Sequence, residues 1–116
     1  MENHFEICMT EDQLRGISSI GLAHMGDAVF ELLVRSYLCA AGKAANGNLH
    51  RATVDLVCAP AQAARADRML PLLSEAELAY YRRGRNAHVR QIPKNATHEQ
   101  YAKATGLECL FGALYL

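Results

Sequence analysis

Two acidic residues of this 116-residue chain lie in apolar stretches, where a charge is costly. Asp27 follows Gly26 inside an apolar run with helical spacing, and Glu108 is the only charged residue between Leu107 and Leu116. Aspartate has poor helix propensity, and a buried charge without a partner is unfavourable, so something must compensate both acids. Two such carboxylates suggest one shared cation, and oxygen ligands completed by water suit magnesium.

A magnesium ion held by Asp27 and Glu108 can activate water and neutralise the charge of a phosphodiester. The alternative is that both acids bond to the backbone or to a basic partner in a structural network. Glu31 lies four residues after Asp27 and four before Arg35, so these three side chains share one stripe of a helix. Glu31 could orient a metal-bound water, but an ion pair with Arg35 is the favoured role.

Glycines flank both acids, with Gly26 before Asp27 and with Gly106 and Gly112 on either side of Glu108. A glycine inside a helix costs about 1 kcal/mol relative to alanine unless close packing offsets that cost. The pattern therefore predicts that the two helices bearing the acids cross tightly at these glycines.

Positive charge gathers in one segment, although the formal net charge of the chain is zero. Cations outnumber the single acid between Tyr80 and Lys103, and this segment is interpreted as a cationic loop that holds phosphates of a nucleic acid. A solvated polar loop is the alternative. The residues predicted to contact the nucleic acid, of which Arg83 and Arg85 are the strongest candidates, are Arg82, Arg83, Arg85, Asn86, Arg90, Lys94 and Asn95.

The elements that must position these residues are all predicted to be helices, because no stretch alternates as a strand does. Serine and threonine capping boxes mark two of the starts, Ser74 with Glu77 and Thr97 with Gln100, and Pro60 separates two others. The sequence thus predicts a polar leader over 1–18 and one all-α domain over 19–116. The expected helices span about 19–41, 49–57, 60–70, 75–86 and 98–116.

The composition is 51% hydrophobic, which is enough for a packed core in a single domain. No basic, apolar leader and no run of membrane-spanning length is present, so a cytoplasmic protein without a membrane partner is expected. The four cysteines form no C-x-x-C pair and are interpreted as small buried apolar residues: Cys8, Cys39, Cys58 and Cys109.

Several segments, in order and spacing, resemble the motifs of the Mini-ribonuclease III family. The segment LAHMGDAVFE, from Leu22 to Glu31, is similar to the signature helix of the ribonuclease III superfamily. The resemblance covers nearly everything from Ile20 onward. Its further blocks are LHRAT (49–53), AQA (61–63), RRGRNA (82–87), PKNA (93–96) and LFGALYL (110–116).

The resemblance implies a ribonuclease III catalytic-domain helical bundle that acts as a homodimer. By the same resemblance, Asp27 and Glu108 take the catalytic, metal-binding positions, with Mg²⁺ as the cofactor and Mn²⁺ as a possible substitute. The implied reaction is hydrolysis of double-stranded RNA to 5′-phosphate and 3′-hydroxyl ends. The implied role is maturation of large-subunit (23S) ribosomal RNA precursor, with a ribosomal protein as a further candidate partner.

The chain departs from full-length ribonuclease III at two positions, because Ala23 and Thr105 stand where that enzyme has further acids. Mini-ribonuclease III lacks these acids too, so the departure favours the subfamily and one metal ion per site. The chain also has no double-stranded-RNA-binding domain, and family members usually carry another short helix after the position of Leu116. The alternative function is a catalytically silent RNA-binding or structural dimer of the same fold, which the retention of Asp27 and Glu108 disfavours.

Overall fold

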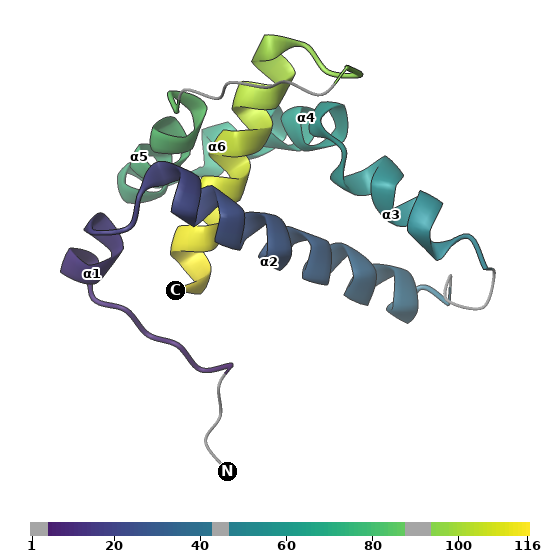
Figure 1. Ribbon diagram of the computed structural model, residues 1–116, viewed down its shortest axis with the longest axis horizontal. Coiled ribbons are helices and arrows are strands. Elements are labelled where there is room, and N and C mark those ends of the chain that lie inside the picture. Colours follow the sequence, from purple (N-terminus) through teal and green to yellow (C-terminus); the bar gives the residue numbers. More distant parts are fainter. Residues whose placement is uncertain (1–4, 43–46, 88–93) are drawn as a thin grey trace.

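The computed structural model describes residues 5–42, 47–87 and 94–116, and within these ranges every regular element is a helix. This confirms the all-α prediction. Figure 1 shows α6 crossing α2 in the middle of the molecule, with α4 and α5 packed on α6. The helices are α1 (Glu11–Arg15), α2 (Ser19–Ala40), α3 (Leu49–Val57), α4 (Ala59–Met69), α5 (Glu75–Arg85) and α6 (His98–Tyr115), with a 3₁₀ turn at Leu70–Leu72 after α4.

Capping side chains set the starts of the helices that matter for the site. The Ser18 hydroxyl accepts a hydrogen bond from the Gly21 amide at 2.9 Å, and α2 begins at the next residue. The predicted capping boxes at Ser74 and Thr97 are both formed, at the starts of α5 and α6. Cys58 is extended between α3 and α4, and Pro60 lies in the first turn of α4, as predicted.

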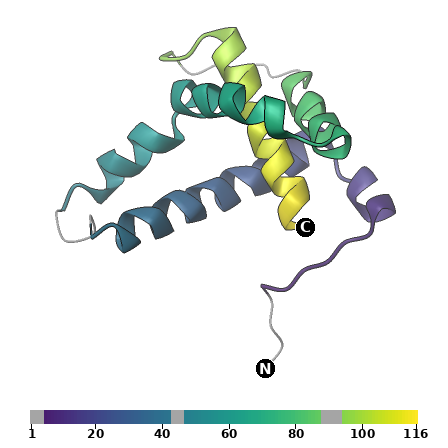
Figure 2. The ribbon, with the colours of Figure 1, turned by 180° about the vertical axis from the view of Figure 1, so that it is seen from behind.

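α6 forms the centre of the hydrophobic core. Its Cys109 and Ala113 pack with side chains of α1 and α2, its Leu107 packs with α4 and α5, and its Phe111 packs on the far half of α2. Leu107, Cys109 and Leu110 of α6 are almost completely inaccessible to solvent. Figure 2, the opposite view, shows that α2 and α3 lie close together at one end and diverge toward the other end, where α6 crosses α2. The helix that bears Glu108 is therefore held on several sides.

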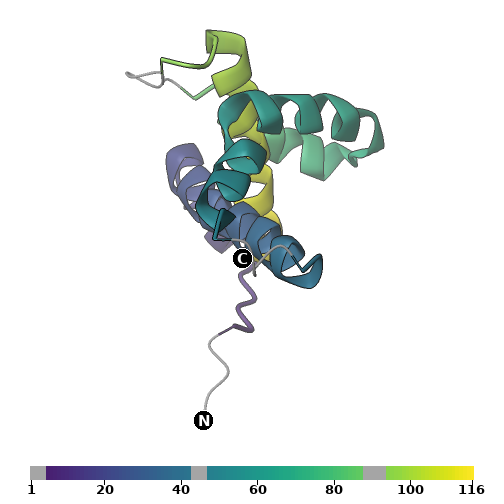
Figure 3. The same cartoon turned by 90° about the vertical axis from the view of Figure 1, so that its right-hand side faces the viewer.

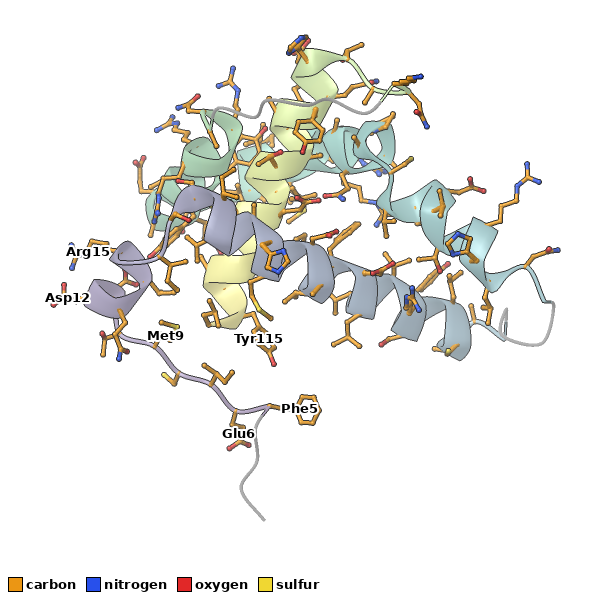
Figure 4. The ribbon with its side chains drawn as sticks, viewed as in Figure 1. Phe5, Glu6, Met9, Asp12, Arg15 and Tyr115 are labelled. Atoms are coloured by element: carbon orange, nitrogen blue, oxygen red, sulfur yellow. The ribbon has the colours of Figure 1, made fainter. Side chains whose placement is uncertain are left out.

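The N-terminal segment belongs partly to the domain, although the sequence predicts a polar leader over 1–18. Thr10 and Gln13 form a capping box that starts α1, and Leu14 is buried in the core beside α2 and α6. The Met9 amide donates to the carbonyl of Leu116 at 2.6 Å, so this segment also contacts the end of α6. Figures 3 and 4 show residues 5–8, including Phe5, which Figure 4 labels, extending away from the helices.

The cysteines of the chain do not all lie in the core. Cys109 is buried, but Cys8 and Cys39 are exposed, so the interpretation of all cysteines as core residues is wrong. Cys39 lies in the last turn of α2 and, together with residues of α3, lines an open hollow, so its thiol stays accessible to solvent. Among the described residues, no helix is both long enough and apolar enough to cross a membrane.

Candidate active site

Asp27 and Glu108 line the same small pocket, although they come from opposite ends of the chain. Asp27 is exposed in the middle of α2, and Glu108 is mostly buried in the middle of α6. The pocket has a volume of about 230 Å³ and is open to solvent on one side. Its remaining walls are Ile20, Ala23, His24, Tyr101 and Thr105.

Two glycines bring the acids together by letting α2 and α6 touch backbone to backbone. A Cβ atom at Gly26 would overlap the carbonyl oxygen of Glu108, and a Cβ atom at Gly112 would overlap the carbonyl oxygen of Leu22. No side chain can be added at either position unless the helices separate, which confirms the predicted tight crossing for these two glycines. Gly106 does not take part, because its neighbour is the ring of Tyr81 on α5.

The pocket disfavours two negative charges. Burial raises the pKa of Glu108 to about 7, the nearby charge of Asp27 adds to the increase, and a hydrogen bond from Gln62 opposes it. Asp27 is exposed as a whole, but partial desolvation of its carboxylate also raises its pKa, with a further increase from Glu31 and an opposing effect of His24. A bound cation would offset both the repulsion between the two carboxylates and the cost of desolvating them.

Gln62 does not line the pocket but contacts one of its acids, and the sequence did not single it out for a role. Its side chain is 2% exposed on α4, and its amide nitrogen donates to Oε1 of Glu108 at 3.1 Å. The same nitrogen donates to the carbonyl of Val57 at 2.8 Å. α4 therefore holds the carboxylate of α6 from the side opposite solvent.

Comparison with known proteins places this geometry in a family. Residues 21–116 match the family described as ribonuclease III domain. A Mini-ribonuclease 3 from Symbiobacterium thermophilum is 44% identical over 95 residues, which cover 82% of this chain and 73% of that protein. A Mini-ribonuclease 3 from Enterococcus faecalis is 40% identical over 102 residues, which cover 86% of this chain and 77% of that protein. The chain belongs to the Mini-ribonuclease III family.

The fold of this Mini-ribonuclease III agrees with that of a solved structure. A crystal structure of a protein from Fusobacterium nucleatum superposes with a TM-score of 0.79 at 30% sequence identity, and the match covers 87% of this chain and 82% of that chain. Ala23 and Thr105 both line the pocket beside Asp27 and Glu108. The two positions at which the sequence comparison with full-length ribonuclease III expects further acids therefore lie in this pocket.

Glu31 of this Mini-ribonuclease III lies beside the pocket and pairs with Arg35. Its Oε1 accepts a hydrogen bond from the Arg35 guanidinium at 3.1 Å, as the helical spacing predicts. The charge of Glu31 still reaches the site, because it raises the pKa of Asp27. Whether Glu31 also orients a metal-bound water stays a prediction.

Three arginines of the predicted cationic loop are helical, which agrees with the expected helix over 75–86 and corrects the interpretation of these residues as part of a loop. Arg82, Arg83 and Arg85 form the last turn of α5, and Gly84 is not a flexible joint, because a Cβ atom there would lie 2.5 Å from the Thr105 carbonyl oxygen. The sequence signal for this was the Ser74 capping box, which starts a helix long enough to include them.

Arg83 is engaged within the protein, unlike its neighbours. Its guanidinium donates to the Ile17 carbonyl at 2.7 Å and to the Ser19 hydroxyl at 3.4 Å, and it lies 5.8 Å from the centre of the Tyr80 ring. These contacts tie α5 to the start of α2. Arg83 therefore has a structural role in this geometry, and whether it or the more exposed Arg85 contacts RNA stays a prediction.

The other predicted RNA contacts lie near the two ends of the connection between α5 and α6. Arg82 and Arg85 are exposed and form no ion pair within the described ranges, and Asn86 is the exposed C-cap of α5. Lys94 and Asn95 are exposed in the turn that precedes α6. Arg90, the remaining candidate, lies outside the described residues.

Proposed function

We propose that this chain is a magnesium-dependent endoribonuclease that hydrolyses double-stranded RNA to 5′-phosphate and 3′-hydroxyl ends. The observation that carries the proposal is the meeting of Asp27 and Glu108 in one pocket of a ribonuclease III domain. Among the residues that the structure describes, no lysine or arginine forms an ion pair with either acid. A purely structural charge network would provide such a partner.

The donor set of the pocket fits a hard divalent cation. Asp27 and Glu108 would hold it through carboxylate oxygens, and the open side of the pocket leaves room for the water ligands that magnesium retains. Within the described ranges, no group of three or more histidine, cysteine or acidic side chains is placed to bind a metal, so one ion per pocket is expected. Mn²⁺ is the expected substitute. Such an ion supplies an activated water and neutralises phosphodiester charge.

The protein's own cations would hold the duplex near the acids. Arg82 and Arg85 end α5, and Lys94 and Asn95 precede the helix that bears Glu108. Exposed arginine and lysine side chains neutralise phosphates, and double-stranded RNA is recognised mainly through its shape, phosphates and 2′-hydroxyls. We therefore expect binding with little dependence on RNA sequence.

The proposed enzyme is a homodimer in the maturation of large-subunit ribosomal RNA, with a ribosomal protein as a candidate partner. Support for the dimer comes from family membership and from exposed apolar side chains along α2, such as Ile20, Leu33 and Tyr37. A two-fold dimer would present two pockets to one duplex. Sedimentation of an active sample tests this, and an active monomer would contradict it.

The decisive experiment is incubation of the purified protein with long duplex RNA, with and without magnesium. We expect cleavage only with the metal, and near-complete loss of cleavage in Asp27→Asn and in Glu108→Gln while folding and RNA binding persist. Asp12→Asn is the matched control, because Asp12 is an exposed acid that pairs with Arg15 on α1. Normal turnover in either pocket variant would overturn the assignment of the site.

A further inference from the structure

Gln62 has a hydrogen-bonding arrangement that packing alone does not explain. Its amide nitrogen lies between two acceptors, the Val57 carbonyl at 2.8 Å and Oε1 of Glu108 at 3.1 Å. Because both neighbours accept hydrogen bonds, only the nitrogen can face them, and the orientation of the amide is fixed. The first turn of α4 thus directs one donor at a carboxylate that belongs to α6.

The other half of the same amide is unfavourable for stability. Oε1 of Gln62 is buried and accepts no hydrogen bond from any residue that the structure describes. A buried acceptor without a partner costs free energy, and an apolar residue of similar shape would avoid that cost while filling the same space. Stability therefore favours an apolar residue at position 62, and what glutamine adds there is the donor that faces Glu108.

That donor fixes how Glu108 presents its carboxylate. Oε1 is held by Gln62, whereas no described residue donates a hydrogen bond to Oε2. Glu108 also experiences the charge of Asp27, which on its own would favour rotation of the carboxylate away from the pocket. A tether to α4 opposes that rotation and leaves one oxygen available beside Asp27.

We propose that Gln62 is a positioning residue that holds the Glu108 carboxylate in the orientation required for a divalent cation shared with Asp27. This inference rests on the proposed function, since it concerns the same pocket. Gln62 does not touch the substrate or the cation in this arrangement. It acts through Glu108, as residues behind metal ligands do when they fix the orientation of those ligands.

The test compares Gln62→Met with the wild-type protein and with Thr53→Val. Methionine is unbranched like glutamine, and it removes both the donor and the unpaired acceptor. Thr53 is a matched control, because it is also a buried polar residue, 4% exposed, but its hydroxyl bonds only to the Leu49 carbonyl within α3. The measurements are the melting temperature, the affinity for Mn²⁺ by electron paramagnetic resonance without RNA, and kcat and KM on duplex RNA over a range of magnesium concentrations.

We expect Gln62→Met to melt at the wild-type temperature or above it and to bind Mn²⁺ about 10- to 100-fold more weakly. KM for RNA should be unchanged, and kcat should be low at limiting magnesium but recover at high magnesium. Thr53→Val should keep wild-type Mn²⁺ affinity and kcat. A merely structural role for Gln62 predicts the reverse: a lower melting temperature and no rescue by magnesium.

The outcomes separate this inference from the proposed function. If the wild-type protein cleaves duplex RNA but Gln62→Met binds Mn²⁺ equally well, the positioning role is overturned and the nuclease assignment stands. If the wild-type protein binds Mn²⁺ but cleaves no duplex RNA, the function is overturned, and the ratio of Mn²⁺ affinities still decides the role of Gln62. An unfolded Gln62→Met protein, or a wild-type protein without Mn²⁺ affinity, would also overturn the positioning role of Gln62.

Discussion

Glu108→Gln should make the metal-free protein more stable while removing its activity. Glu108 is buried beside the charge of Asp27, and its pKa is raised from the ordinary 4.5 to about 7. Glutamine keeps the size of the side chain and an oxygen that can accept from Gln62, but it carries no charge to desolvate. The carboxylate is therefore a cost to folding that the variant avoids.

The size of this effect follows from proton linkage. Between pH 4.5 and about 7 the folded state retains a proton on Glu108 that the unfolded chain has released, so the stability of the wild-type protein falls as pH rises through this window. A rise of the pKa from 4.5 to about 7 corresponds to roughly 3 kcal/mol, fully developed above pH 7 and absent near pH 4. The raised pKa of Asp27 acts in the same direction.

Urea unfolding in EDTA at pH 5 and pH 8 measures the difference directly. The free energies of unfolding of wild-type protein and Glu108→Gln should differ by less than about 1 kcal/mol at pH 5 and by up to about 3 kcal/mol at pH 8, with the variant more stable. Magnesium should then stabilise only the wild-type protein, because a ligand stabilises the state that binds it. Equal pH dependence of the two proteins, or a less stable variant at pH 8, would refute the account of the pocket as a site of unfavourable charge.

Other changes test the crossing, the donor set and the arginines. Gly26→Ala should lower the free energy of unfolding by more than about 2 kcal/mol in urea titrations and reduce cleavage, because the added Cβ meets the backbone of α6 rather than a movable side chain. Thr105→Asp adds a carboxylate to the pocket and should tighten Mn²⁺ binding, as calorimetry would measure; unchanged affinity would argue against a metal there. Arg85→Ala should weaken duplex binding and flatten the slope of log affinity against log salt concentration by somewhat under about one unit. Arg83→Ala should mainly lower the free energy of unfolding, by about 1–3 kcal/mol. Filter binding at several salt concentrations and thermal melts separate the two arginines, and an equal loss of RNA affinity in both would contradict the distinction.

The two acids and the helices that bear them could be predicted from the sequence, because each has a local sequence signal. A charge in an apolar helix is visible at Asp27 and Glu108 without any structure, and the capping boxes at Ser74 and Thr97 mark starts that the structure confirms. The α1 helix had the same kind of signal in Thr10, followed three residues later by glutamine, but its shortness and polar composition concealed it.

Features that depend on which elements become neighbours could not be predicted in this way. A glycine in a helix indicates close approach but not which element approaches. Gly106 was therefore predicted to lie at the crossing of α6 with α2, although it packs on Tyr81 of α5. Gln62 lies in an alanine-rich helix where glutamine is ordinary, and its burial arises only from the packing of α4 on α6. The sequence alone indicates a surface cation at Arg83, because only the tertiary structure shows its hydrogen bond to the Ile17 carbonyl.

The long separation between the two acids has a consequence for when activity can arise. Asp27 is synthesised well before Glu108, and the pocket exists only once α6 has crossed α2. Contacts between segments so distant in sequence form late, because closing a long loop is entropically unfavourable until the core can form around it. A partly folded chain in which α6 has not yet docked on α2 therefore has no assembled pocket.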